Sequence, residues 1–432
     1  MLGKIFKNKL FKNSSIYMLF NVLQALVPFL ILPILTRFLS ESGMGFYVTY
    51  QSVYNLAIPI LTQSLDTAVL INYFHISEEN FKKYFSTAIF VFPGLILFAF
   101  FATLLFSSYI SAIIEFDIRV IYITYITVFF CFFNRLALNY FRVLEKPLSF
   151  GVHSLSMALL TNGLLVYCVL FDVEISWFEI VASLALGQGL VAIFSIYYLL
   201  KLKLIKFVIA KEYVRDLFKI GAPLSLHQIG TWSGNVGSRL VVSAVLGYVA
   251  VAHYGVAMTF GAIMTIIQDS FNKAFSPHMY GRLKKLGIIE NEKDAISEKR
   301  RIVRLTYLYN FSLVVLGVVV SILGYFFIGI IFGEKYRGAH VFIPFAVFGA
   351  VFNGMYKMHV VYLFYFKKTL KIAKITILTG ILNIAFCYVV LNLFDNAIGA
   401  AVSLVITQIL AYVLAWYDGQ KSIELPWFSF RK

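Results

Sequence analysis

Long apolar runs separated by short polar segments recur along the whole chain. A helix needs about 20 apolar residues to cross a bilayer, and runs of that size occur twelve times in this sequence. Pro59 predicts a kink or a tilt in the second run, and the seventh run is rich in Gly and Ser. The pattern predicts membrane-spanning helices near residues 14–36, 45–74, 85–107, 118–141, 149–171, 178–200, 220–247, 252–275, 305–331, 341–366, 375–393 and 397–417.

The segments that connect these runs differ in charge from one side to the other. Of the 37 Lys and Arg residues, 29 lie in one set of segments and three in the other. Because positive charge stays in the cytoplasm, we expect the richer set, and with it both termini, to be cytoplasmic. That set comprises residues 1–13, 75–84, 142–148, 201–219, 276–304, 367–374 and 418–432.

Composition supports a membrane protein. Hydrophobic residues make up 60% of the chain and charged residues 13%, against roughly a half and a quarter in soluble proteins. This balance excludes a soluble enzyme, a nucleic-acid-binding domain and a disordered chain; the net charge of +16 comes from the short basic loops. The first run lacks a small-x-small cleavage site, so we interpret it as an uncleaved transmembrane helix. No connecting segment is long enough for a core of its own, so the function must lie within the helices.

Nothing in the sequence points to a metal site, a cofactor or a catalytic residue. The cysteines form no CxxC pair, and the histidines within spans lack metal-ligand spacing. We expect these histidines to be hydrogen-bonded structural residues, although His227 and His359 facing a transport path is an alternative. No Gly-rich phosphate loop occurs, so we expect no ATP hydrolysis by this chain. The residues concerned are Cys131, Cys168, Cys387, His153, His227, His253 and His359.

The two halves of the sequence echo one another. Phe133-Asn134 returns as Phe352-Asn353, Phe171-Asp172 as Phe394-Asp395, and Ser183-Leu184-x-x-x-Gln188 as Ser403-Leu404-x-x-x-Gln408, at offsets of 219, 223 and 220. The central basic loop falls where a six-plus-six division would place it. We therefore predict two six-helix lobes, residues 1–210 and 211–432, with the same topology and a path between them.

Several short segments together resemble the polysaccharide-transport branch of the multidrug/oligosaccharidyl-lipid/polysaccharide (MOP) exporter superfamily, and most of all its O-antigen flippases. They are spread over the chain from the first span to the eighth. The segments are residues 13–15 (Asn-Ser-Ser), Pro28 and Pro33, residues 35–39 (Leu-Thr-Arg-Phe-Leu), 43–47 (Gly-Met-Gly-Phe-Tyr), 221–224 (Gly-Ala-Pro-Leu), 238–240 (Ser-Arg-Leu) and 274–277 (Ala-Phe-Ser-Pro).

The resemblance implies an all-α integral membrane protein with two six-helix lobes around a central cavity. It also implies a flippase, not an enzyme, that moves an undecaprenyl-diphosphate-linked oligosaccharide from the cytoplasmic to the periplasmic leaflet of the bacterial inner membrane. The expected partners are this lipid, other membrane lipids, a coupling proton or sodium ion, and a glycan polymerase with its chain-length regulator. No nucleic acid is expected.

Six charged residues within the spans are candidates for the site. Buried charge costs about 2.5–3.5 kcal/mol on insertion scales unless it is paired or wet, and Arg and Lys suit phosphate. We expect Lys357, Arg239, Lys273 and Arg135 to line a cationic cavity for the diphosphate, with Asp66 and Asp269 as counter-charges or coupling sites.

The competing interpretations of these charges are structural. Arg135, Lys273 and Arg239 could snorkel to headgroups. Asp269 and Lys273, four residues apart, could neutralise each other. Asp66 could be a structural partner of Arg135 or Lys357.

Polar side chains gather in spans 1, 2, 7 and 8. They either form hydrogen bonds between helices or line a hydrated path and form hydrogen bonds with sugar hydroxyls. The residues are Asn21, Gln24, Gln51, Asn55, Gln63, Asn72, Gln228, Asn235 and Gln268.

Other functions remain open from the residues alone. An ion-coupled multidrug antiporter of the same superfamily would favour an acidic lobe, and the four cations against two acids within the spans count against it. A membrane glycan polymerase or glycosyltransferase would need a larger outer loop. An ion channel would need a filter-like loop.

Overall fold

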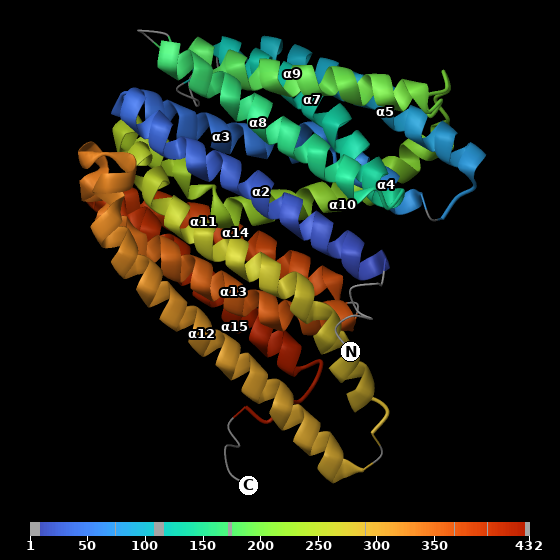
Figure 1. Cartoon of the computed structure of the whole chain (residues 1–432), viewed down its shortest axis with the longest axis vertical. Coiled ribbons are helices and arrows are strands. Elements are labelled where there is room, and N and C mark those ends of the chain that lie inside the picture. The colour runs from blue at the N-terminus through green and yellow to red at the C-terminus, as the bar shows by residue number, and fades with distance from the viewer. Residues whose placement is uncertain are drawn as a thin grey trace. The chain divides into compact units, whose positions relative to one another are not determined.

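The protein is built from long helices. The computed structural model describes residues 9–73, 75–107, 116–171, 175–289, 291–366, 368–394 and 396–427, and within these ranges every regular element is helical (Figure 1). In these ranges, ten helices are long and apolar enough to cross a membrane. Large apolar side chains lie on their outer surfaces, such as Phe98 at 74% exposure, where lipid rather than water would cover them. The prediction of an all-α integral membrane protein is confirmed.

The helices follow the predicted spans closely. Those up to the middle of the chain are α2 (Lys9–Phe38), α3 (Glu41–Thr62), α4 (Leu65–Asn72), α5 (Glu78–Leu105), α7 (Ile118–Val143), α8 (Pro147–Phe171), α9 (Trp177–Lys201) and α10 (Lys211–Asn235). Those that follow are α11 (Ser238–Leu286), α12 (Glu292–Phe332), the short η1 (Glu334–Phe342), α13 (Ile343–Tyr365), α14 (Thr369–Phe394) and α15 (Ile398–Gln420).

The second span, for which Pro59 predicts a kink or a tilt, consists of two helices. Pro59 lies inside α3, whereas the helix ends at Thr62 and a new helix, α4, begins at Leu65. Between them Gln63 and Ser64 adopt left-handed φ angles of 47° and 50°. Neither residue is a glycine, so this conformation needs support from the surroundings.

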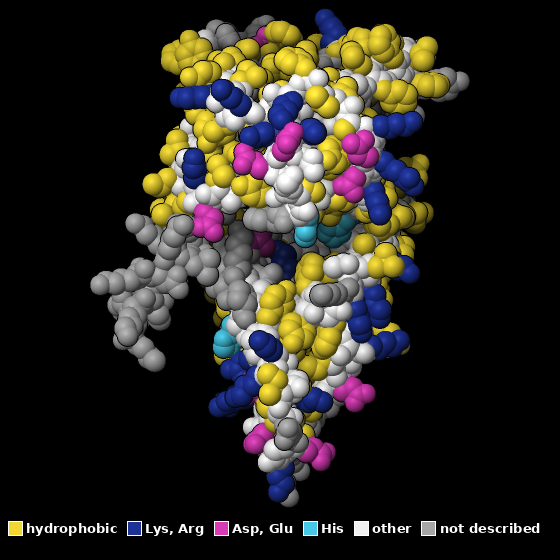
Figure 2. Space-filling view, turned by 90° about the vertical axis from the view of Figure 1, so that its right-hand side faces the viewer, with side chains coloured by type: hydrophobic (Ala, Val, Ile, Leu, Met, Phe, Trp, Pro, Cys, Tyr) yellow, Lys and Arg dark blue, Asp and Glu magenta, His cyan; other side chains and the backbone are white. Residues whose placement is uncertain are grey.

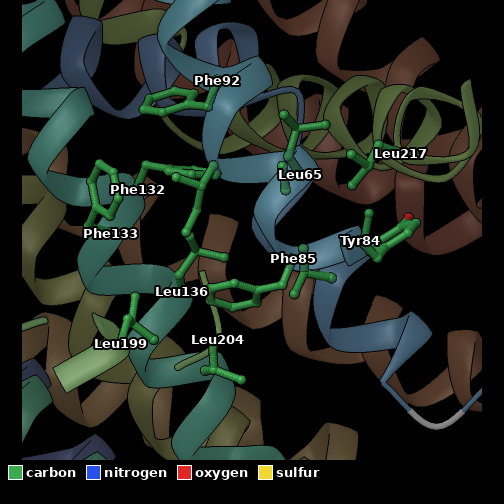
Figure 3. Close-up of a cluster of buried hydrophobic side chains, with 14 of the residues drawn as sticks. Leu65, Tyr84, Phe85, Phe92, Phe132, Phe133, Leu136, Leu199, Leu204 and Leu217 are labelled. Carbon is green, nitrogen blue, oxygen red and sulfur yellow. The ribbon is translucent and has the colours of Figure 1, made fainter. Parts of the chain in front are cut away.

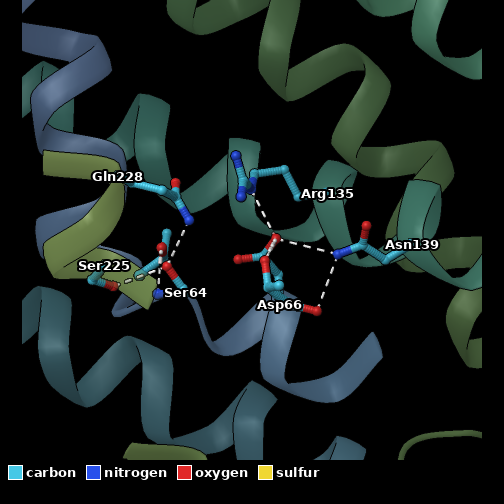
Figure 4. A network of polar contacts seen from close by, with 8 residues as sticks. Ser64, Asp66, Arg135, Asn139, Ser225 and Gln228 are labelled. Carbon is cyan, nitrogen blue, oxygen red and sulfur yellow. Dashed lines mark hydrogen bonds and ion pairs between the residues drawn. The ribbon is translucent and has the colours of Figure 1, made fainter. Parts of the chain in front are cut away.

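Helix α10 supplies that support. The carbonyl oxygen of Gln63 lies 2.2 Å from the point where a Cβ on Gly221 would stand, so only glycine permits this approach. One turn further along α10, the hydroxyls of Ser225 and Ser64 are hydrogen-bonded at 2.9 Å, and Gln228 Nε2 donates to Ser64 Oγ at 2.9 Å (Figure 4). A face of α10 with period 3.6 therefore holds the break in the second span.

The seventh predicted span is divided between two helices. It begins in α10 and ends in the first part of α11, where Gly247 has a φ of 80° and interrupts the helical path. Neither α10 nor the α3–α4 pair is among the ten membrane-crossing candidates. The first turns of α10 carry Lys211, Glu212, Arg215 and Asp216, which lowers its apolar character.

The chain forms two compact units, Met1–Ile229 and Gly230–Lys432, and the boundary falls within α10. The predicted division between residues 210 and 211 precedes this helix and stays a prediction, as does a path between lobes. In the first unit α7 packs on α9 and α2 on α8; in the second, α13 packs on α15 and α11 on α13.

The first unit is held together by a large aromatic and aliphatic core. Phe85, Phe92 and Phe132 are fully buried, together with Leu65 and Leu136 (Figure 3). The rings of Phe92 and Phe132 stack with centroids 3.9 Å apart. Leu65 is the first residue of α4, so this core fixes the start of the helix that follows the break in the second span.

The sequence repeat corresponds to a repeated contact. Asn134 on α7 donates from Nδ2 to Gln188 Oε1 on α9 at 3.0 Å. At the matching positions of the second unit, Asn353 on α13 donates to Gln408 Oε1 on α15, also at 3.0 Å. The same helix pair is thus joined by the same amide pair in each unit.

One face of the protein carries many charged side chains. The face drawn in Figure 2 carries many Lys and Arg side chains beside Asp and Glu, as expected of a surface outside the hydrocarbon. The cytoplasmic position of this surface and of both termini stays a prediction.

Candidate functional site

The first ion pair joins the start of α4 to α7. Asp66 Oδ2 accepts a hydrogen bond from Arg135 Nε at 2.9 Å and from Asn139 Nδ2 at 3.2 Å, and Asn139 also bonds the Asp66 carbonyl oxygen at 3.0 Å (Figure 4). The Asp66 side chain is 1% exposed and that of Arg135 30%. Asp66 lies in the first turn of α4, where the helix dipole favours negative charge.

Arg135 is only partly used by this pair. Nε is its one nitrogen with a protein acceptor among the described residues, so both terminal nitrogens can still donate. A guanidinium in this state can bind a further anion such as a phosphate oxygen. Asn139, one turn after Arg135 on α7, was not anticipated from the sequence, although its i, i+4 spacing from Arg135 placed it on the same face.

The second ion pair joins α11 to α13. Lys357 Nζ lies 2.6 Å from Asp269 Oδ1, with side-chain exposures of 21% and 48%. The carboxylate of Asp269 is bonded to Lys357 on another helix, so its charge is balanced without Lys273 on its own helix. Lys357 has no acid in its own helix, and its partner comes from α11.

Both pairs use corresponding helices of the two units, displaced by one turn. The repeat that aligns Asn134 with Asn353 places Gly354 at the position of Arg135. A Cβ on Gly354 would lie 2.6 Å from the Gln268 side chain, which fills this space and donates to the Ala350 carbonyl oxygen. The cation of the second unit therefore stands one turn later, at Lys357.

Arg239 and Lys273 belong to neither pair. Arg239 is the second residue of α11, directly after the junction with α10. Lys273 lies one turn after Asp269 on α11, and its side chain is outside the described residues. The six predicted residues thus form two pairs, one in each unit, with two further cations on α11; their convergence on one cationic cavity stays a prediction.

The buried histidines differ in their surroundings. His153 Nε2 is 3.2 Å from the Ser195 hydroxyl, which donates to Asn134 Oδ1, so it belongs to the amide network of the first unit. Neither ring nitrogen of His359 has a hydrogen-bond partner among the described residues. It lies among the rings of Tyr362, Tyr412 and Trp427. The expectation of a hydrogen-bonded structural histidine is therefore wrong for His359.

Solved structures with a similar fold are membrane transporters. The lipid II flippase MurJ, in an inward closed conformation, matches with a TM-score of 0.70 at 14% identity, over 93% of this chain and 87% of that one. A multidrug resistance MATE family transporter of the MOP superfamily, in an outward-facing conformation, matches with a TM-score of 0.56 at 13% identity, over 94% and 93%. This chain shares its fold with both of these multi-pass transporters.

The sequence comparisons give the family. The polysaccharide biosynthesis protein family matches residues 10–279, and the chain belongs to it. Protein 1 of the Lsg locus of Haemophilus influenzae is 22% identical over 385 residues, which cover 87% of this chain and 90% of that protein. The resemblance to the polysaccharide-transport branch of the MOP superfamily is confirmed.

Proposed function

We propose that this chain is a flippase of the bacterial inner membrane. Its substrate is an undecaprenyl-diphosphate-linked glycan repeat unit, of an O-antigen or similar surface polysaccharide, moved from the cytoplasmic to the periplasmic leaflet. The family and the fold shared with a lipid II flippase support this substrate class. No covalent step is involved: the protein binds the lipid-linked glycan and exposes it alternately to the two sides.

The observation that carries the proposal is the Arg135–Asp66 pair. A diphosphate cannot enter a low-dielectric bundle without cationic partners, and the terminal nitrogens of Arg135 lack a protein acceptor among the described residues. Asp66 neutralises the guanidinium while the site is empty, so the unloaded protein avoids a bare buried cation. The arriving diphosphate supplies the remaining negative charge.

Lys357 and Asp269 serve the second unit in the same way. This pair is more exposed than the first, so it is better hydrated and easier to open. Arg239, at the start of α11, and Lys273, one turn after Asp269, add further positive charge. Movement is coupled to a proton or sodium ion, with the two aspartates as the carboxylates at which such an ion would bind.

The test is complementation in the native host. The chromosomal copy is deleted, and wild type, Arg135→Gln or Lys357→Ala is restored at matched membrane expression. We expect the deletion to remove surface polysaccharide and to accumulate lipid-linked repeat units on the cytoplasmic side. Wild type should restore the glycan, and each variant should restore much less.

Arg119→Gln is the matched control. Arg119 also pairs with an aspartate, Asp117, at 2.6 Å, but its side chain is 69% exposed at the start of α7. Such surface pairs contribute little, so this variant should restore surface glycan fully. Unchanged surface glycan in the deletion strain, with no redundant exporter, would contradict the flippase and favour a multidrug antiporter. Full rescue by Arg135→Gln would remove Arg135 from the mechanism.

A further inference from the structure

The first unit contains a polar cavity that neither ion pair uses. Its volume is about 330 Å³, and it lies among α2, α3, α7, α8 and α9. Amide side chains reach it from four of these helices: Gln24, Gln51, Asn55, Asn162 and Gln188. None of the lining residues that the structure describes is charged, so the cavity differs in chemistry from the Arg135–Asp66 pair.

Several polar groups at the cavity lack protein partners. The side-chain amides of Gln24, Gln51 and Asn55 line the cavity and make no hydrogen bond among the described residues. Polar groups inside a protein are normally hydrogen-bonded. A membrane-embedded protein cannot rely on bulk water for this, so these groups need a polar occupant of the cavity.

In the second unit, the glutamine that matches Gln188 is bonded to protein groups. There, Gln408 Nε2 donates to the Gly234 carbonyl oxygen at 3.1 Å and to Asn235 Oδ1 at 3.3 Å, and Asn383 bonds the Ser233 carbonyl oxygen at 3.0 Å. The end of α10 is thereby drawn onto α14 and α15. A Cβ on Gly380 would lie only 2.5 Å from the Gly230 carbonyl oxygen, so these helices meet without a gap.

In the first unit, the matching glutamine lies at the cavity instead. Gln188 matches Gln408 and keeps the repeated bond to the asparagine of α7, but its Nε2 has no protein acceptor among the described residues. It lines the cavity beside Asn162, whose Nδ2 bonds only the Ala158 carbonyl oxygen of its own helix at 2.8 Å. The amide group of Gln408 is thus bonded to α10, whereas the matching amide group of Gln188 can bond a ligand in the cavity.

We propose that this cavity binds an uncharged sugar residue of the lipid-linked glycan, an assignment that rests on the proposed function. Amides both donate and accept, which suits neighbouring hydroxyls of a pyranose. Tyr54, which is partly exposed and lines the cavity, offers an aromatic ring to its apolar side. The volume of about 330 Å³ is at the small end of ligand pockets, which fits one or two sugar rings and not a whole repeat unit.

The experiment compares two lipids that differ only in the glycan. The full-length protein in lipid nanodiscs is titrated with lipid-linked oligosaccharide extracted from the deletion host, and separately with undecaprenyl diphosphate. We expect wild type to bind the glycan-bearing lipid about tenfold more tightly, since two or three hydrogen bonds of ordinary strength give a ratio of that order.

Gln51→Met/Asn55→Leu removes two cavity amides while keeping side-chain volume. This variant should lose the tenfold preference and bind undecaprenyl diphosphate as wild type does. Asn392→Leu is the control, because Asn392 is an exposed amide that bonds only the Tyr388 carbonyl oxygen of its own helix, and it should keep the preference. Arg135→Gln should weaken binding of both lipids alike.

The outcomes separate the two proposals. A preference that survives in Gln51→Met/Asn55→Leu overturns the sugar site, as does wild type that binds both lipids equally; the flippase then stands and the cavity holds only water. Wild type that binds neither lipid overturns the proposed function. Replacing the amides by apolar side chains removes groups without partners, so folding of the double variant should be preserved, and its elution as a single monodisperse species checks this.

Discussion

Asp66 shows how much one buried carboxylate depends on its neighbours. Its side chain is 1% exposed, and Oδ1 has no hydrogen-bond partner among the described residues. The charge is offset by Arg135 and Asn139 through the other oxygen. Removing one partner of such a pair costs far more than the pair itself contributes, since it leaves an uncompensated charge.

We therefore expect Asp66→Asn to destabilise the protein by about 3–5 kcal/mol. Thermal unfolding of the purified protein in detergent measures this effect. Asp66→Asn/Arg135→Gln should recover part of the loss, because no bare cation remains. Asp117→Asn, in the exposed pair at the start of α7, should change the unfolding temperature little. Equal unfolding temperatures for Asp66→Asn and wild type would show that the pair is open in the membrane protein.

The choice of partners could not be read from the sequence, although the charged residues themselves could. Asp66, Arg135, Asp269 and Lys357 stood out because ionisable residues within apolar runs are costly. Whether Asp269 pairs with Lys273 or Lys357 depends on how closely α11 approaches α13. Gln268 and Gly354 decide that approach, and neither carries a signal in the apolar pattern.

At the scale of elements, the hydropathy pattern located the helices because each must bridge the same thickness of lipid. It did not predict the break in the second span, where Gln63 and Ser64 leave the helical conformation after the end of α3. The cause is Gly221 and Ser225, over 150 positions away in the chain. A local pattern cannot report a constraint imposed by a distant helix.

This contact gives a prediction for Gly221. Gly221→Ala places a Cβ about 2.2 Å from the Gln63 carbonyl oxygen, so α10 must shift away, and we expect a loss of about 1–3 kcal/mol in stability. Gly163→Ala in α8 is the control: nothing lies within 4 Å of the added Cβ, and alanine should stabilise that helix by about 0.5–1 kcal/mol. Unfolding temperatures of the two variants should move in opposite directions.

At the scale of the whole molecule, the sequence repeat corresponds to a side-chain contact that occurs once in each unit. The pairs Asn134–Gln188 and Asn353–Gln408 have the same 3.0 Å contact. The difference between the units was not visible in the repeat itself. It arises where Gln408 bonds the end of α10 while Gln188 faces a cavity, which depends on how a neighbouring helix packs.

The orientation of the whole chain is a separate prediction. The excess of Lys and Arg on one set of loops places both termini in the cytoplasm. A fluorescent protein fused after Lys432 should therefore fluoresce, and alkaline phosphatase fused within residues 37–44 should be active in the periplasm. Phosphatase fused within residues 142–148 should be inactive. The reverse pattern at these sites would contradict the predicted topology.

Helix α10 has a consequence for how the chain tolerates insertions. It is one continuous helix from Lys211 to Asn235, yet its residues up to Ile229 belong to one unit and those from Gly230 to the other. Each residue of an α-helix turns the chain by about 100°. A single residue inserted between Gly221 and Ser225 would turn Ser225 and Gln228 by this angle relative to Gly221, so they could no longer meet Ser64 while Gly221 meets Gln63. An inserted residue in a loop such as 202–210 would alter no such phase.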